Sequence, residues 1–271
     1  MNICKCGVLL SDEFKICQVC DDFNSLDKII CGDSSIILDR VKEEFIDLVV
    51  TSPPYNFGME YDEHNDKQDW DDYKEKLFLI LRGCAFALKP SGRMAINIQP
   101  AFSQFIPIHH EITTMLRQFG LLWRAEILWD KQNYNCKTTA WGSWQSPSNP
   151  YVRYTHEFIE VFSKGDMKKE GDKEKIDIKG DGFSKWTLGK WEIPPETNMK
   201  EFGHPAMFPE EIPRRLIQLY SYVGDIVLDP FCGVGTTCVV AKKLQRRYLG
   251  IEKSEKYCET ARKRLDGRLF W

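Results

Sequence analysis

Short apolar runs alternate with longer amphipathic stretches along most of the chain. The runs have the length and the branched and aromatic content that buried strands favour, and turn residues separate them. They cover residues 28–32, 46–50, 93–98, 123–129 and 157–163. Residues 70–88 and 107–119 have helical spacing; the turn sequence Lys89-Pro90-Ser91-Gly92 follows the first and Gly120 follows the second.

The C-terminal third continues this alternation most clearly, with strands predicted at 225–229 and 247–252 and helices at 236–244 and 254–265. A strand–helix–strand–helix order predicts parallel strands joined by right-handed crossovers. The pattern as a whole predicts an α/β fold, a mostly parallel sheet with helices on both faces.

Two segments depart from the alternation. Residues 1–24 are marked by cysteines, and residues 132–203 are rich in Trp, Ser, Asn, Pro, Gly and Lys. Within the second segment, residues 164–181 hold six Lys and six acidic residues and almost no apolar ones. Such a composition favours a mobile loop.

Composition indicates a globular protein: of 271 residues, 42% are hydrophobic and 28% charged. No stretch approaches the roughly 20 apolar residues of a membrane helix, and the first residues lack the features of a secretory signal. A cytoplasmic protein with no membrane partner is therefore expected. The net charge of −3 argues against a surface coated in positive charge but leaves room for a local basic cleft.

The cysteine-marked segment holds two close pairs, Cys4 with Cys6 and Cys17 with Cys20. Four thiolates in two pairs suit tetrahedral zinc, although a one-residue gap is tighter than usual. We therefore predict that these four cysteines bind a structural zinc ion. The alternative is a set of unligated or redox-active thiols.

A glycine-containing turn follows the strand that ends at Asp229. The sequence Pro230-Phe231-Cys232-Gly233-Val234-Gly235 leads into Thr236 and Thr237, where a helix N-cap belongs. It lacks the Lys of a phosphate-binding loop and the third glycine of the dinucleotide motif. The next strand ends at Glu252, the usual position of an acceptor for ribose hydroxyls. These features favour a nucleoside cofactor without a pyrophosphate; the alternative is a plain strand–turn–helix connection with a surface Glu.

A second motif, Ser52-Pro53-Pro54-Tyr55, directly follows the strand at 46–50. Two prolines stiffen the chain and remove two N–H donors, so this corner is rich in acceptors. The amino group of cytosine or adenine is a poor nucleophile, and acceptors for its two N–H groups would favour a pyramidal nitrogen with a localised lone pair. The Tyr55 ring could stack on an extruded base. The alternative is a proline-rich turn with a packed tyrosine.

Together the two motifs resemble the β class of DNA amino-methyltransferases, over residues 26 to 266. The resemblance implies a Rossmann-like fold, S-adenosylmethionine as cofactor, and catalysis by Ser52, Pro53, Pro54 and Tyr55. It also implies that the strand leading to Asp33 lies beside the strand ending at Glu252, and that residues 153–162 line the target-base pocket. The cofactor residues that it implies are Asp33, His204, Pro205, Phe208, Asp229, Pro230, Phe231, Gly233, Gly235, Thr236, Thr237 and Glu252.

The resemblance also bears on the target base. Ser at the first position of the corner is commoner among cytosine-N4 enzymes, whereas Asp is usual among adenine-N6 enzymes. Cytosine N4 is therefore preferred and adenine N6 is the alternative. A C5-cytosine enzyme is disfavoured, because its nucleophilic Cys typically follows Pro and none of the ten cysteines here does.

These inferences divide the chain into residues 1–24 (candidate zinc segment), 25–131 (catalytic half), 132–203 (pocket strand and candidate target recognition) and 204–271 (cofactor-binding half). The recognition segment contains Trp141, Trp144, Trp186 and Trp191 among amide and basic side chains, which suit contacts to bases. The alternative is that these tryptophans anchor an insertion to the body.

Double-stranded DNA is the expected partner. The resemblance also implies two possible further partners, a second copy of the chain in a homodimer and a cognate restriction endonuclease. The sequence does not show whether either is present. Two other functions remain open: an RNA base methyltransferase, and a catalytically silent nucleic-acid-binding protein.

Overall fold

The computed structural model describes residues 2–3, 9–10, 26–41, 44–56, 60–61, 64–65, 68–99, 105–133, 142–197, 199, 202–204 and 206–268. Cys4, Cys6, Cys17 and Cys20 lie outside these residues, and so does Pro205. The predicted zinc site is therefore untested. Among the described residues, no helix has the length and apolar content needed to cross a membrane.

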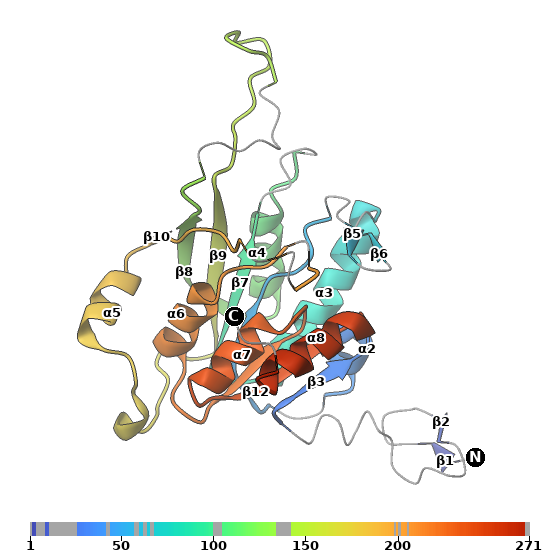
Figure 1. The fold of residues 1–271 in the computed structure, drawn as a ribbon, viewed down its shortest axis with the longest axis vertical. Coiled ribbons are helices and arrows are strands. Elements are labelled where there is room, and N and C mark those ends of the chain that lie inside the picture. The colour runs from blue at the N-terminus through green and yellow to red at the C-terminus, as the bar shows by residue number, and fades with distance from the viewer. Residues whose placement is uncertain are drawn as a thin grey trace.

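An eight-stranded sheet forms the centre of the molecule (Figure 1). Seven strands run parallel to one another, and only β9 runs against its two neighbours. The order across the sheet is β10 (Lys190–Glu192), β8 (Leu121–Asp130), β9 (His156–Lys164), β7 (Leu88–Ile98), β4 (Ile46–Thr51), β11 (Ile226–Asp229), β12 (Arg247–Glu252) and β3 (Lys28–Cys31). The mostly parallel sheet expected from the sequence is confirmed.

Helices cover both faces of the sheet. One core contains α2 (Ser34–Asp39), α3 (Trp70–Ala87) and α4 (Ile108–Gln118), and the other α6 (Glu211–Tyr220), α7 (Thr236–Lys243) and α8 (Glu255–Leu265). Strand β4 contributes side chains to both cores: Val49 packs into the first, whereas Leu48 and Val50 pack into the second. Successive side chains of a strand point to opposite faces, so a strand covered on both sides is apolar throughout.

Strands β3 and β12, the first and the last strand of the central sheet along the chain, lie side by side at one edge of it. Strand β3 pairs in parallel with β12, with Cys31 opposite Glu252, and the Gly32 N–H donates to the Glu252 carbonyl at 2.8 Å. The adjacency implied by the family resemblance is thus confirmed.

Several elements differ from expectation. Residues 89–92 belong to β7, where Ser91 has φ of +60° and the pairing with β4 shifts between Ile46 and Leu48. The predicted turn is therefore an irregularity within a longer strand. Helix α5 (Gly180–Trp186) and strand β10 were not expected, because both are too short to show a hydrophobic period. Two small hairpins complete the fold: β1 (Asn2–Ile3) with β2 (Leu9–Leu10), and β5 (Glu60–Tyr61) with β6 (His64–Asn65).

Residues 164–181 are irregular apart from a 3₁₀ turn at Lys173–Lys175 and the first residues of α5. They are nevertheless tied to the body. The Lys169 ammonium lies 2.7 Å from an Asp47 carboxylate oxygen and 3.3 Å from one of Asp225, and Arg246 forms an ion pair with Asp177. Charge pairing thus holds a segment that has too few apolar side chains for a core of its own.

Candidate active site

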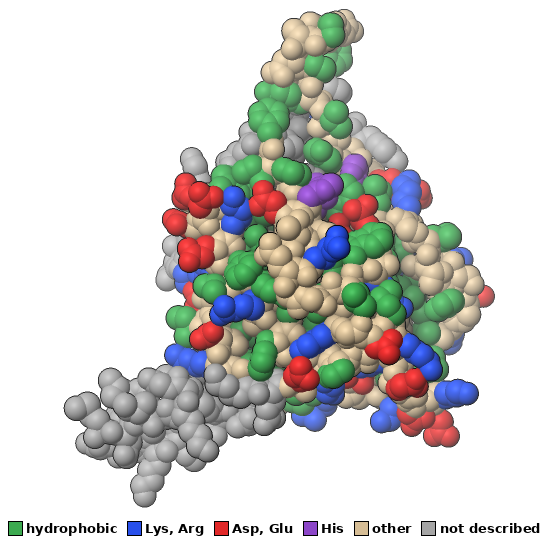
Figure 2. Space-filling model, turned by 180° about the vertical axis from the view of Figure 1, so that it is seen from behind, with side chains coloured by type: hydrophobic (Ala, Val, Ile, Leu, Met, Phe, Trp, Pro, Cys, Tyr) green, Lys and Arg blue, Asp and Glu red, His purple; other side chains and the backbone are tan. Residues whose placement is uncertain are grey.

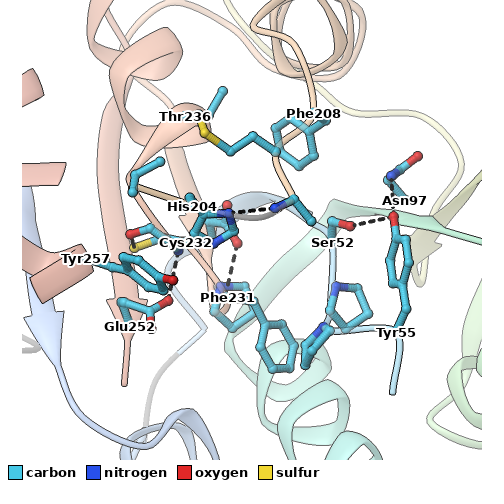
Figure 3. Close-up of a pocket in the computed structure, with 18 of the residues that line it drawn as sticks. Ser52, Tyr55, Asn97, His204, Phe208, Phe231, Cys232, Thr236, Glu252 and Tyr257 are labelled. Carbon is cyan, nitrogen blue, oxygen red and sulfur yellow. Dashed lines mark hydrogen bonds between the residues drawn. The ribbon is translucent and has the colours of Figure 1, made fainter. Parts of the chain in front are cut away.

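The predicted site residues meet in one cavity of about 930 Å³ at the carboxyl ends of the parallel strands (Figure 3). Asp33, Ser52, Asp229 and Glu252 stand at the ends of β3, β4, β11 and β12, the edge at which open α/β sheets bind ligands. The cavity is lined by all four corner residues and by Asp33, His204, Phe208, Asp229, Pro230, Phe231, Gly233, Thr236 and Glu252. Gly235 and Thr237 do not line it, and Pro205 lies outside the described residues.

The two glycines of the turn have different roles. Gly233 has φ of +51°, and a Cβ there would lie 2.9 Å from His204 Nε2, so glycine lets the loop lie close to that ring. Gly235 has φ of +82°, and a Cβ would lie 2.8 Å from the Ala261 Cβ. Gly235 thus permits α7 to begin against α8, which is a packing role beneath the cavity wall.

Glu252 connects the turn to the end of β12. Its Oε2 accepts a hydrogen bond from the Gly233 N–H at 2.9 Å, and its Oε1 accepts one from the Ser254 N–H at 2.9 Å. A carboxylate has acceptor capacity beyond two bonds. The side chain can therefore hold the turn and still accept from ligand hydroxyls.

Asp33 lies across the cavity as the N-cap of α2. One carboxylate oxygen accepts from the Ser35 N–H at 3.0 Å, and the other lies 2.7 Å from the Lys76 ammonium. Burial alone would raise the pKa of Asp33, but the hydrogen bonds from Lys76 and Ser35 lower it below its ordinary value. Asp33 therefore stays ionised and fixed in place.

Asp229 is a buried carboxyl group below the turn, 2% exposed. Its Oδ1 accepts from the Thr51 hydroxyl at 2.6 Å and from the Phe231 N–H at 3.1 Å. Burial raises the pKa of Asp229 to about 6, against the opposing effect of these bonds. A positively charged group in the cavity would favour its ionised form.

His204 reaches the cavity from the segment before α6. Burial lowers the pKa of His204 to about 4, so the ring is neutral at physiological pH. Its Nδ1 accepts from the Ala206 N–H at 3.2 Å, which leaves the proton on Nε2. The ring packs on that of Tyr257 with centroids 4.7 Å apart.

The Ser-Pro-Pro-Tyr corner is fixed by hydrogen bonds from the neighbouring helix and its N-terminal approach. The Tyr73 hydroxyl donates to the Pro54 carbonyl at 2.7 Å. Asn56, with φ of +58°, accepts from the Gln68 N–H at 2.7 Å and donates to the Gln68 carbonyl at 3.1 Å. The corner is thus held before any ligand binds.

The Tyr55 hydroxyl contacts Glu157, which belongs to the residues 153–162 expected at the pocket, and accepts from the amide nitrogen of Asn97 at 3.1 Å, a residue that the sequence did not single out. Glu157, 4% exposed at the start of β9, accepts from that hydroxyl at 2.7 Å and also from the Asn97 amide nitrogen. Its other oxygen pairs with the Lys131 ammonium. These residues lie near strand ends around the cavity. The family resemblance of residues 153–162 was the signal for Glu157, whereas the sequence offered no signal for Asn97 or Lys131.

These contacts set the direction of the hydrogen bonds at Ser52. The single Tyr55 O–H proton is committed to Glu157, and Ser52 Oγ lies 3.1 Å from the Tyr55 oxygen (Figure 3). The Ser52 hydroxyl must therefore donate to Tyr55, which leaves its own oxygen as an acceptor. This arrangement can accept a hydrogen bond from an amino group placed in the cavity.

Comparison with known proteins identifies relatives of this chain. Residues 46–263 match the N6_N4_Mtase family of DNA methylases. The type II methyltransferase M.MjaI of Methanocaldococcus jannaschii is 32% identical, with 85% of this chain and 88% of that protein covered. M.BglII of Bacillus subtilis is 30% identical, with 89% and 69% covered. A Thermus thermophilus protein with the provisional name of a DNA modification methylase, solved with S-adenosyl-L-methionine, superposes with a TM-score of 0.69 at 25% identity, over 89% of this chain and 95% of that one.

Proposed function

The chain belongs to the N6_N4_Mtase family of DNA methylases, and on that premise we propose that it methylates the exocyclic N4 amino group of cytosine in duplex DNA. The chain is an S-adenosylmethionine-dependent DNA amino-methyltransferase of the restriction-modification type. The choice of base, the residue roles and the extrusion of the base from the duplex belong to the proposal.

The cavity suits S-adenosylmethionine in shape and charge. Glu252 would accept from the ribose hydroxyls, and Gly233 and His204, which lie close together, would form part of the wall beside the ligand. Asp229 would lie near the positive charge of the ligand, which favours ionisation of this buried carboxyl. The cofactor supplies an electrophilic methyl group on a sulfonium centre.

The direction of the hydrogen bond at Ser52 is the observation that carries the proposed chemistry. Ser52 Oγ and the Pro53 carbonyl would accept the two N–H groups of the target amine, which favours a pyramidal nitrogen with a localised lone pair. Both groups stand in the cavity that the cofactor residues also line. The nitrogen would bond to the methyl carbon as the carbon–sulfur bond breaks, the neutral thioether would leave, and the methylated nitrogen would lose one proton to solvent. Such a transfer requires neither a covalent enzyme intermediate nor a metal ion.

Cytosine is favoured by the residues opposite the amine. Ser52 is a neutral acceptor, and the Lys131 ammonium, which pairs with Glu157, has further N–H donors at the same cavity. Cytosine presents two acceptors, N3 and O2, beside its amino group, and such donors would match them. Adenine N6 remains the alternative, because its amine needs the same two acceptors.

The direct experiment is incubation with duplex DNA and S-adenosylmethionine, followed by nucleoside mass spectrometry. N4-methylcytosine is the expected product. N6-methyladenine would keep the mechanism and overturn the base choice. A product found only on RNA, or cofactor binding with no methylated nucleoside, would support the RNA or the silent alternative.

Zinc binding by Cys4, Cys6, Cys17 and Cys20 stays a prediction, as do a cytoplasmic location, a homodimer and a cognate endonuclease. Elemental analysis of the purified chain tests the first: one zinc per chain is expected, and loss of zinc in each of the four single Cys→Ser variants would assign the ligand set.

A further inference from the structure

The sheet topology divides residues 132–203 between two opposite edges of the molecule. Strand β8 runs toward the cavity edge and β9 runs away from it, so the β8–β9 connection emerges beside the cavity. The Lys131 N–H donates to the Thr155 carbonyl at 3.0 Å at the base of this connection. Lys131 and Glu157, which flank that base, both line the cavity.

The residues after β9 start from the far edge instead. Lys164 donates to the Leu88 carbonyl at 2.7 Å, where β7 begins, and Lys169 pairs with Asp47 near the start of β4. Trp191 is 1% exposed, and the Arg214 guanidinium lies 4.6 Å from the Trp186 ring centroid. These two tryptophans anchor the segment to the body, and the charged residues around 164–181 lie away from the cavity.

Two parts of the segment lie at the cavity edge: the residues after β10, of which Pro195 and Met199 line the cavity, and residues 142–154, here termed the finger. The finger projects from the body at the top of Figure 1, and Figure 2 shows apolar side chains along it and histidines gathered at its base. Trp144 is 63% exposed and Val152 is 77% exposed. The finger contains no Asp or Glu and one Arg, so nothing in it repels a phosphate backbone.

Internal hydrogen bonds shape the tip of the finger. The Ser143 N–H donates to the Asn149 carbonyl at 2.9 Å, and the Ser143 hydroxyl accepts from the Asn149 N–H at 2.9 Å. Gly142 has φ of +67°, and a Cβ there would lie 2.2 Å from the Asn149 carbonyl oxygen. Tyr151 packs edge-on against Phe105, with ring centroids 6.2 Å apart, and this contact braces the finger from the side of α4. Such a tip presents Trp144 at little ordering cost.

We propose that the finger enters duplex DNA beside the target base and that Trp144 acts as an apolar wedge between base pairs. The inference rests on the proposed function, since a base must leave the stack to reach the cavity, and an apolar side chain can stabilise the opened step. Seven residues, Ser148 to Tyr154, span at most roughly 25 Å. That reach exceeds the depth of either groove, roughly 8 Å.

The test compares Trp144→Ala with Phe183→Ala, a matched control on the far side that removes another exposed aromatic ring, 54% exposed on α5. The wild-type reaction first maps the methylated site. Equilibrium binding and methylation are then measured on a fully paired duplex with that site and on the same duplex with an abasic position opposite the target base.

Trp144→Ala should weaken binding to the paired duplex roughly five- to hundredfold, the range for loss of one base–aromatic stack. The abasic duplex should recover most of that loss, because its target base is already unpaired. Trp144→Phe should keep most of the affinity, Phe183→Ala should match the wild type, and cofactor affinity should stay unchanged in all three.

Wild-type affinity in Trp144→Ala overturns the wedge, and so does an equal loss on both duplexes, which would indicate a general DNA contact. A wild type that methylates no DNA counts against the proposed function instead. In that case, binding to a random-sequence duplex pool tests the proposed role of the finger. Equal affinities of the wild type and Trp144→Ala for that pool would overturn the role of Trp144 as a wedge.

Discussion

The Tyr55 hydroxyl donates a hydrogen bond to Glu157 Oε2 over 2.7 Å, from the loop after β4 to the first residues of β9. Because this bond uses the only phenol proton, it fixes the roles of the groups around it. Ser52 must donate to Tyr55 and can then accept from a substrate amine. The charge of Glu157 thereby acts on the Ser-Pro-Pro-Tyr corner through Tyr55.

Tyr55→Phe should separate the ring from its hydroxyl. The ring would still stack on an extruded base, but Ser52 would lose the acceptor that orients its proton. A bond to a charged network contributes about 1.5–3 kcal/mol, so kcat should fall roughly ten- to hundredfold with KM for DNA little changed. Tyr55→Ala should lower kcat further and raise KM for DNA. Steady-state kinetics on the mapped site test both, and full activity of Tyr55→Ala would exclude the stacking role.

Glu157→Gln should reverse the hydrogen-bond direction while keeping the shape of the side chain. Its amide N–H₂ can donate to Tyr55, so the phenol proton can turn toward Ser52 and occupy its oxygen. The expected result is a kcat lowered roughly tenfold or more and an unchanged Kd for S-adenosylmethionine. Glu170→Gln, at a side chain 82% exposed, is the control. Equal kinetics of the two variants would show that Glu157 does not orient the corner.

Glu252→Gln should weaken the cofactor and leave the fold intact. The amide oxygen can keep one of the two backbone N–H bonds but loses the charge that strengthens bonds from ribose hydroxyls. We expect the Kd for S-adenosylmethionine, measured by calorimetry, to rise about tenfold or more. Glu259→Gln, on the exposed side of α8, should bind as the wild type does. Unchanged affinity in Glu252→Gln would remove Glu252 from the cofactor site.

Substitution of Asp229 by Asn should raise the free energy of unfolding and weaken the binding of S-adenosylmethionine. Its pKa is raised to about 6 from an ordinary 3.8, so the folded state binds this proton more tightly than the unfolded state does. The stability from that proton is present at low pH and is lost as pH rises through about 6. Asp229→Asn keeps an oxygen for Thr51 and Phe231 and removes the buried charge.

Urea unfolding at pH 5 and pH 8 measures this effect. The free energy of unfolding of Asp229→Asn should exceed that of the wild type at pH 8 by an amount on the order of 1–3 kcal/mol, and the difference should shrink at pH 5. Calorimetry at pH 8 should show weaker S-adenosylmethionine binding by the same variant. A pH-independent difference in stability would mean that Asp229 is not the group that titrates.

Local signals predicted most of the fold. Strands β3, β4, β7, β8, β9, β11 and β12 contain the apolar runs that predicted them, and the parallel order of most of them follows from their alternation with helices. Short elements such as β10 escaped, because Trp191 is its only buried residue and one residue shows no period. The turn at 89–92 was assigned from Pro and Gly, yet pairing with β4 carries the strand through it.

The same distinction applies to the site residues: local sequence motifs predicted some of them, and others became recognisable only in the tertiary structure. Ser52, Asp229 and Glu252 could be found because each follows an apolar run within a motif. Asn97 and Lys131 could not be found, because Asn97 lies inside an ordinary strand, β7, and Lys131 follows another, β8; both gain a role only where these strands bring them beside Glu157. Gly235 and Thr237 belong to the motif but do not line the cavity. Gly235 lies against α8, and Thr237 is buried within α7. A motif identifies the loop that meets the ligand, and only the tertiary structure shows which of its members do so.

The pairing of β3 with β12 also has a consequence for the synthesis of the protein. The Ser34 hydroxyl donates to the Pro230 carbonyl, 196 residues further along the chain, and both residues line the cavity, so parts of its wall are made at widely separated times during synthesis. A growing chain carries the Ser-Pro-Pro-Tyr corner long before the residues that complete the cavity leave the ribosome. Translation that stops early would therefore release fragments unable to bind the methyl donor, and no such fragment could mark DNA.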